Sequence, residues 1–193
     1  RIQHFVSRKA MNIDGLGDET IKLLYDKGFL KNISDIYNLD YKSISLIDGH
    51  ADKSVDNLKM GIENSKSKPF QKVLYGLGIR YVGESASRKI LKKIKSIEEL
   101  MLMDLESLSK IDEIGEKTAA SISEFFKDEN NRKLIDKLKS AGLVFIDDNK
   151  DNTSSSLSNL TFVISGVFET HSRDEIRNLI EINGGKISSS VSS

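Results

Sequence analysis

Four short turns, each placed just before a helical pattern, constrain the fold of this chain more than any other feature. They lie at residues 13–20, 47–54, 79–86 and 111–118. Each has an apolar residue, a tight turn that carries glycine, and then a small or polar residue suited to starting a helix. Gly15 and Gly49 are 34 positions apart, while Gly83 and Gly115 are 32 positions apart. This spacing indicates a duplicated pair of helix–turn–helix units.

The glycines in these turns indicate what such units can bind. Glycine adopts positive φ without strain, and it lets a ligand approach the main chain because it has no Cβ. The helix that follows begins with unpaired N–H groups and the positive end of its dipole, directed to one place. Such a main-chain site binds a phosphate and does not distinguish bases. Two pairs of these turns are therefore suited to both strands of a duplex nucleic acid across one groove.

Charge is balanced over the whole chain, with 29 Lys and Arg against 29 Asp and Glu, but it is uneven locally. Between Ser65 and Ser96 the single acidic residue is Glu84, and the basic residues are Lys66, Lys68, Lys72, Arg80, Arg88, Lys89, Lys92, Lys93 and Lys95. Such a stretch suits a polyanion, because each phosphate that it neutralises releases condensed counterions. A solvated helix face is the alternative interpretation of this basic stretch.

For the repeat of the four turns, the alternative is a tetratricopeptide scaffold, which also has a period of 34 residues. That pattern does not use a Gly-x-Gly turn.

The hydrophobic periodicity before residue 147 is helical. Apolar stripes at helical spacing occur at Ile21, Leu23 and Leu24, at Ile90, Leu91 and Ile94, and at Leu134, Ile135 and Leu138. Pro69 predicts a break between two helices, because proline cannot continue one. Ser96 with Glu99 predicts a capping box, and Gly142 predicts the end of a helix.

Residues 147–156 are polar throughout, which predicts a linker. They imitate the start of a calcium loop, but Asn152 and Ser158 stand where that loop needs glycine and glutamate. Beyond the linker, residues 160–164 predict a strand, 173–183 an amphipathic helix, and 186–188 a second strand.

The composition excludes several classes of protein. The chain has no cysteine, which excludes a disulfide scaffold, a Cys-ligated metal and a Cys nucleophile. No apolar run approaches the roughly 18 residues of a membrane span. His4, His50 and His171 share no ligand spacing, so we assign no metal site. The chain begins at Arg1 and not at Met, and we expect it to be a piece of a longer protein.

Three blocks of sequence carry a resemblance to a known family. Residues 1–17 (RIQHFVSRKAMNIDGLG) closely resemble the segment that follows the zinc finger in bacterial NAD-dependent DNA ligases. Residues 77–84 (LGIRYVGE) are similar to the third helix-hairpin-helix of that family. The third block, FVISG at 162–166 with RDEI at 173–176 and GGK at 184–186, resembles the opening of its BRCT domain.

The resemblance implies a mainly α fold of four hairpins in two pairs, followed by a linker and a truncated β-α-β piece. The expected boundaries are 1–146 for the helix-hairpin-helix domain (sub-units 1–64 and 65–146), 147–158 for the linker and 159–193 for the BRCT piece. The implied function is binding of duplex DNA around nicks, without sequence preference, within a ligase that seals 3′-hydroxyl/5′-phosphate nicks in replication and repair. The implied setting is the bacterial cytoplasm at the nucleoid, with no membrane contact.

The family's catalytic residue has no counterpart here. The ligases attack NAD with the lysine of a Lys-x-Asp-Gly motif, and Asn12 and Leu46 stand at that position in the two near matches of this chain. We therefore expect no catalysis by this segment alone and no cofactor within it. The resemblance implies NAD, magnesium and zinc for the longer ligase, whose remaining domains are the expected protein partners.

The expected DNA-binding residues come from the four turns and the basic residues near them. They are Arg8, Lys9, Gly15, Leu16, Gly17, Thr20, Gly49, His50, Lys53, Ser54, Arg80, Tyr81, Val82, Gly83, Ser85, Lys89, Gly115, Lys117 and Thr118. Lys89 is also expected, together with Lys92 and Lys93, to attract DNA over a longer range. Tyr81 and Glu113 replace the first glycine of the third and fourth turns, and Ala51 replaces the second glycine of the second. These turns are expected to use less permissive backbone or to make contacts through side chains, and Glu113 is expected to repel phosphate.

Two other classes stay open. One is a helix-hairpin-helix module of another repair or recombination protein, against which the GGK-containing third block argues. The other is a base-excision glycosylase, which needs a flipped-base pocket and a carboxylate after the hairpin. Asp136 is the nearest candidate for that carboxylate, but an ion pair with Arg132, four residues earlier on the helix, is the expected role.

Overall fold

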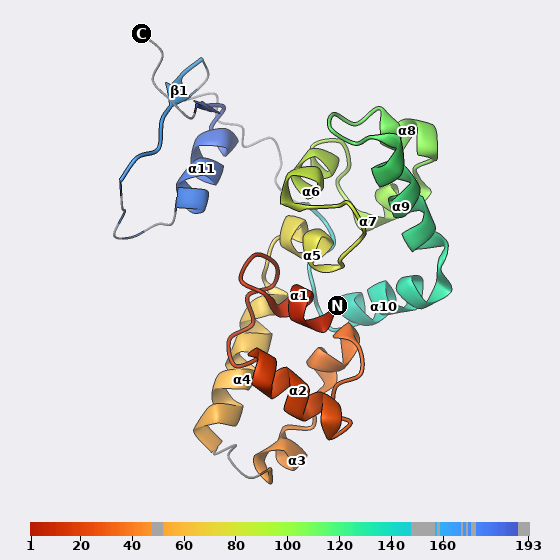
Figure 1. The fold of residues 1–193 in the computed structure, drawn as a ribbon, viewed down its shortest axis with the longest axis vertical. Coiled ribbons are helices and arrows are strands. Elements are labelled where there is room, and N and C mark those ends of the chain that lie inside the picture. The colour runs from red at the N-terminus through yellow and green to blue at the C-terminus, as the bar shows by residue number, and fades with distance from the viewer. Residues whose placement is uncertain are drawn as a thin grey trace. The chain divides into compact units, whose positions relative to one another are not determined.

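The structure is a computed structural model that describes residues 1–47, 52–147, 157, 159–166, 168, 170 and 173–188. The chain divides into two compact units, Arg1–Asp147 and Asp148–Ser193 (Figure 1). The first is helical, and the second contains a short parallel pair of strands with one helix. A mainly helical fold with a β-α-β piece at its end is the fold that the sequence predicts. Each unit is described separately below.

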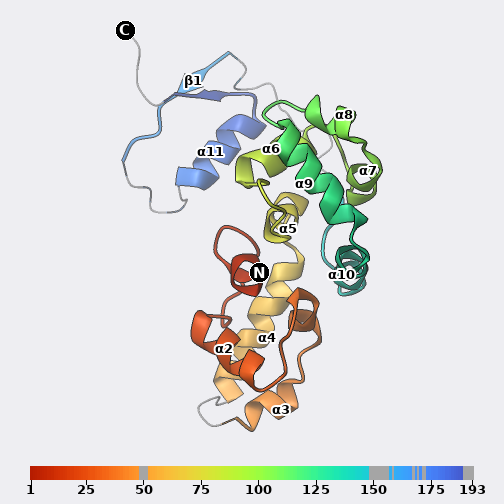
Figure 2. The same ribbon diagram turned by 45° about the vertical axis from the view of Figure 1, so that its right-hand side comes forward.

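The first unit consists of short helices joined by tight turns (Figures 1 and 2). They are α1 (Ile2–Val6), α2 (Asp18–Asp26), the 3-10 helix η1 (Ile33–Asn38), α3 (Tyr41–Ser45), α4 (Asp52–Lys66), α5 (Phe70–Gly76), α6 (Glu84–Leu91), α7 (Ile97–Leu102), α8 (Leu105–Ser109), α9 (Glu116–Lys127) and α10 (Glu129–Ser140). The four predicted turns fall between α1 and α2, α3 and α4, α5 and α6, and α8 and α9. The second of them, at residues 48–51, lies outside the described residues. The other three helix–turn–helix pairs are thus confirmed.

Local sequence explains where most of these elements begin and end. Five of them start with a side chain that accepts a hydrogen bond from a main-chain N–H of the first turn: Asn32, Asp40, Ser96, Asp104 and Asp128. Pro69 separates α4 from α5, and Gly142 follows α10 with a φ of +94°. The predicted capping box at Ser96 is half formed, because Glu99 accepts from the N–H of Lys95, the residue before the cap.

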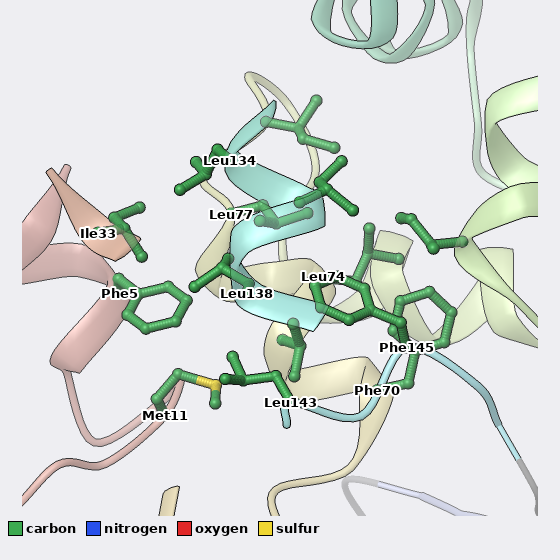
Figure 3. Close-up of a cluster of buried hydrophobic side chains, with 14 of the residues drawn as sticks. Phe5, Met11, Ile33, Phe70, Leu74, Leu77, Leu134, Leu138, Leu143 and Phe145 are labelled. Atoms are coloured by element: carbon green, nitrogen blue, oxygen red, sulfur yellow. The ribbon is translucent and has the colours of Figure 1, made fainter. Parts of the chain in front are cut away.

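One continuous hydrophobic core runs through the first unit, from Phe5 to Phe145. All three predicted helical stripes contribute to it, with Leu23 of the first stripe left half-buried. The last helix, α10, packs against η1, so Leu134 and Leu138 lie among side chains from the beginning and the middle of the chain (Figure 3). The chain then returns to α7, where the N–H of Ile97 donates to the carbonyl of Phe145 at 3.1 Å.

The second unit pairs β1 (Thr161–Phe162) with β2 (Lys186–Ile187) in parallel, joined through α11 (Arg173–Ile182). Both strands are shorter than predicted. The turn before β2 is tightly packed, because a Cβ on Gly185 would lie 2.6 Å from Cγ2 of Ile180. This is the β-α-β order that the sequence predicts.

Candidate nucleic-acid interface

The three described turns share one main-chain geometry. Each has a residue with positive φ, namely Gly15 (+86°), Tyr81 (+66°) and Glu113 (+64°). The next residue donates its N–H to the carbonyl three positions earlier, at 3.0–3.3 Å, and so closes the turn. The glycine that follows is extended and precedes the helix as its N-cap. Turns of different sequence therefore converge on the same shape.

Tyr81 and Glu113 adopt the same left-handed backbone as Gly15. This outcome corresponds to the predicted use of less permissive backbone where glycine is missing. A non-glycine residue in the left-handed region costs about 1–2 kcal/mol relative to its preferred conformations. The rest of each hairpin supplies that energy, since the flanking Ile79, Val82 and Ile111 are buried in the core.

The helices that follow the turns begin without a side-chain cap. The N-caps of α2, α6 and α9 are Gly17, Gly83 and Gly115, and none of the three helices has a capping side chain. A Cβ built on any of these glycines meets no atom within 4 Å. Their φ values are −72°, −85° and −78°, which any residue adopts. Nothing in the described fold therefore requires glycine at these positions, and the first N–H groups of each helix stay open to an anion.

Gly15 has a different role from Gly17, although both were predicted to bind DNA. A Cβ on Gly15 would lie 2.9 Å from Cα of Leu58 in α4. On the facing helix, a Cβ on Gly61 would lie 2.2 Å from the carbonyl oxygen of Asp14. These two glycines allow the first turn to pack directly on α4, which runs beside α2 in both views (Figures 1 and 2). The packing of the first turn on α4 therefore explains why residue 15 is glycine, without reference to DNA.

Carboxylates stand at the first position of each hairpin helix, and two of them are held by neighbouring side chains. Asp18 accepts a hydrogen bond from Nε2 of Gln3 at 3.0 Å. Glu84 accepts from Nζ of Lys72 at 3.0 Å, and the same ammonium donates to the carbonyl of Lys9 at 2.9 Å. Lys72 therefore joins the loop at residues 7–10 to the third turn.

The basic residues predicted to bind DNA differ in their exposure and in their ion pairs. Arg8, Lys9 and Arg80 are exposed, and the Arg80 guanidinium lies 5.0 Å from the centroid of the exposed Tyr81 ring. The Lys89 ammonium is instead shared between the carboxylates of Asp112 and Glu113. Its predicted attraction for DNA stays a prediction.

The pKa values of this pair follow from its hydrogen bonds. The bond to Asp112 and then the bond to Glu113 raise the pKa of Lys89. The bond from Lys89 lowers the pKa of Asp112. Glu113 was expected to repel phosphate, and its carboxylate shares the single Lys89 ammonium with Asp112.

The other predicted residues fall into three groups. Leu16 and Val82 are buried in the core. Of the polar members, Ser85 and Lys117 are exposed on the hairpin helices, Thr20 and Thr118 are partly buried there, and Lys53 and Ser54 are exposed on α4. Gly49 and His50, with Ala51, lie outside the described residues.

Other candidate chemistry finds little support in the part of the chain that the structure describes. His4 packs its ring against Tyr75, and its Nε2 lies 2.9 Å from the Tyr75 carbonyl oxygen. The described residues contain no group of three or more His, Asp or Glu side chains that could hold a metal ion. None of the described helices is long and apolar enough to cross a membrane.

The carboxylate considered for glycosylase chemistry is exposed on α10. The expected ion pair between Asp136 and Arg132 is wrong. Arg132 directs its Nε–H to the carbonyl of Phe126 at 2.5 Å, because the start of α10 lies beside the end of α9.

Sequence reasoning missed the side chains that connect the turns to the body of the unit: Gln3, Lys72, Asp112 and, in its role as a partner of α6, Glu113. Lys72 was noted only as part of a charge run. Its partners lie 63 and 12 positions away, and no local pattern indicates such pairs.

Comparisons with known proteins bear on all these regions. Residues 72–135 match the family described as "Helix-hairpin-helix motif", and residues 7–64 match "SAM-like Helix-hairpin-helix tandem". Residues 152–193 match "BRCA1 C Terminus (BRCT) domain". The chain is 47% identical over 194 residues to a protein of Flavobacterium psychrophilum named "DNA ligase", and 50% identical over 195 residues to one of Bacteroides fragilis with the same name. Each alignment covers 100% of this chain and 29% of the relative, so the chain spans less than a third of the proteins that it matches.

Proposed function

We propose, from the premise that this chain is a helix-hairpin-helix and BRCT segment of the bacterial DNA ligase family, that its helical unit binds duplex DNA through the phosphate backbone. Main-chain N–H groups at the starts of α2, α6 and α9 contact phosphate oxygens. Exposed basic side chains such as Arg8, Lys9 and Arg80 add charge. The contacts lie along the minor groove on both sides of a nick.

The observation that carries this proposal is the glycine at the N-cap of each described hairpin helix. An Asp, Ser or Asn cap stabilises a helix by a few tenths of a kcal/mol more than glycine does, and other helices of this unit use such caps. At Gly17, Gly83 and Gly115 the fold has room for a side chain, yet none is present. A phosphate that approaches the helix axis closely explains this absence, because a Cβ would block its path.

The activity of the longer protein is part of the same proposal. We infer a ligase that seals 3′-hydroxyl/5′-phosphate nicks with NAD as the source of adenylate, acting in replication and repair at the nucleoid. Magnesium and zinc belong to the same proposal, as cofactors of the longer ligase. The segment itself has Asn12 and Leu46 where the adenylated lysine would stand, so its part is to bind DNA while the remaining ligase domains catalyse.

The experiment that tests the proposal is binding of the 193-residue chain to nicked, intact and single-stranded DNA over a salt series. We expect duplex binding whose log affinity falls steeply and linearly with log salt concentration. Duplexes of equal length and different sequence should bind alike, because main-chain contacts to phosphate do not read bases. A strong sequence preference, or no duplex binding at low salt, would contradict the proposal. Base release from damaged duplex would instead favour the glycosylase alternative.

A further inference from the structure

A polar cluster joins α6 to the turn before α9. Oγ of Ser85 donates a hydrogen bond to Oε2 of Glu113 at 3.0 Å. Nζ of Lys89 lies 3.3 Å from Oε1 of the same carboxylate and is hydrogen-bonded to Oδ2 of Asp112. We call these four residues (Ser85, Lys89, Asp112 and Glu113) the latch.

The latch gathers two carboxylates on one ammonium. The Lys89 side chain is 25% exposed, whereas those of Asp112 and Glu113 are 75% and 56% exposed. The lysine is therefore the more enclosed partner, and the acids cover it from the turn. Hydrogen bonding raises the pKa of Lys89 and lowers the pKa of Asp112, so both groups stay ionised across the neutral range.

The backbone at Glu113 indicates that the latch offsets an unfavourable conformation. Its φ of +64° is left-handed, and the equivalent residue of the first turn is Gly15. Glycine would adopt this conformation without strain, and it would also remove a negative charge from the surface that we propose to face DNA. Glutamate has two disadvantages at this position, but its carboxylate makes both contacts to α6.

The latch lies between the N-termini of α6 and α9. Ser85 is the second residue of α6, just after the N-cap Gly83. Glu113 lies two positions before Gly115, the N-cap of α9. The latch thus links the uncapped N-terminus of one hairpin helix to the turn that leads into the other.

We propose that the latch fixes the N-termini of α6 and α9 in one arrangement, so that the third and fourth turns bind the backbone of duplex DNA as a single unit. Glu113 is then a positioning residue that strengthens DNA binding in spite of its charge. Lys89 serves the latch and does not itself bind phosphate. The inference rests on the proposed function, since it concerns the same surface.

The test compares two variants of the 193-residue chain that lose one carboxylate each from the same hairpin. Glu113→Gly breaks the latch, while Glu116→Gln removes the exposed carboxylate at the start of α9, outside the latch. With a duplex oligonucleotide at fixed low salt, we expect Glu113→Gly to bind about three- to fivefold more weakly than the wild type. Glu116→Gln should bind as tightly as the wild type or tighter, because it removes a charge that repels phosphate.

Thermal unfolding separates positioning from simple damage to the fold. Glu113→Gly relieves a left-handed residue, so its melting temperature should equal or exceed that of the wild type while its affinity falls. In a double-mutant cycle of Glu113→Gln with Lys89→Met, the two effects on the free energy of duplex binding should be strongly non-additive, because either change alone breaks the latch.

The outcomes distinguish an error in the role of the latch from an error in the proposed function. If Glu113→Gly binds duplex as tightly as Glu116→Gln, or if the two effects in the cycle add, the latch has no role in binding and the inference is wrong. If the wild-type chain itself does not bind duplex DNA at low salt, the proposed function fails first. The wild-type arm therefore distinguishes the two failures.

Discussion

Replacing Gly83 with valine tests the proposed main-chain phosphate site directly, because the structure separates the effect of the substitution on folding from its effect on binding. The N-cap conformation of Gly83, with φ of −85° and ψ of −175°, suits any residue, and a Cβ there meets no atom within 4 Å. The cost to folding is limited to a poorer N-cap, about 1 kcal/mol. For a domain of this size that lowers the melting temperature by about 3 °C and leaves the chain folded at 25 °C.

The expected cost to binding is larger. In Gly83→Val, the isopropyl group of the new side chain would occupy the space through which a phosphate reaches the first N–H groups of α6. Each charge-assisted hydrogen bond that is lost is worth about 1.5–3 kcal/mol, which corresponds to a tenfold or greater loss of duplex affinity. Fluorescence anisotropy with a labelled duplex measures this loss. Gly83→Ala should give an intermediate value, since its side chain is smaller.

A matched control uses a helix start outside the hairpins. Ser96→Ala removes the hydroxyl that accepts from the N–H of Glu99 at the start of α7, and it changes no charge. It should destabilise the fold about as much as Gly83→Val does, and it should leave duplex affinity unchanged. Equal affinity of Gly83→Val and the wild type would refute the main-chain site, whereas an equal loss in both variants would assign the effect to stability.

Three further expectations follow from particular contacts. Gly61→Ala would place its Cβ 2.2 Å from the carbonyl oxygen of Asp14, so denaturant unfolding should show a loss of about 2 kcal/mol or more. Lys72→Met should weaken duplex binding severalfold in a salt titration and barely alter the circular dichroism spectrum, because it releases Glu84 from an ion pair at 3.0 Å. Burial raises the pKa of Tyr37 to about 12, against about 10 for the unfolded chain, so the stability from its protonated form should be present below pH 10 and be lost as the pH rises toward 12. That fall, about 2 kcal/mol in alkaline unfolding curves, should disappear in Tyr37→Phe.

The helical architecture was predictable because its causes are local. Apolar residues at helical spacing, a single proline and well-placed glycines determine where the helices form and end. The repeat of the turns indicates how the helices pair. The β-α-β order near the end of the chain was equally local, since periodicity changes within a few residues. The strands are nevertheless shorter than predicted, because strand length depends on pairing partners that the sequence pattern does not identify.

The organisation of the site was predictable only in part. The glycine N-caps follow from the sequence, but the separate roles of Gly15 and Gly17 do not, because they depend on whether α4 lies against the turn. The ion pairs of Lys89 were not predicted, since its acidic partners are 23 or more positions away. A charge run identifies a basic segment, whereas the available positive charge depends on ion pairs formed in three dimensions.

At the starts of α2 and α6, the placement of the acidic residue reconciles helix stability with the proposed binding of phosphate. A helix without a capping side chain is destabilised, and an Asp or Glu in its first turn restores about 0.3–1 kcal/mol through the helix dipole. The same charge would repel a phosphate if it lay over the helix axis. Asp18 is instead held by Gln3, and Glu84 by Lys72. The carboxylates can therefore stabilise their helices from the side, while the glycines leave the axis open.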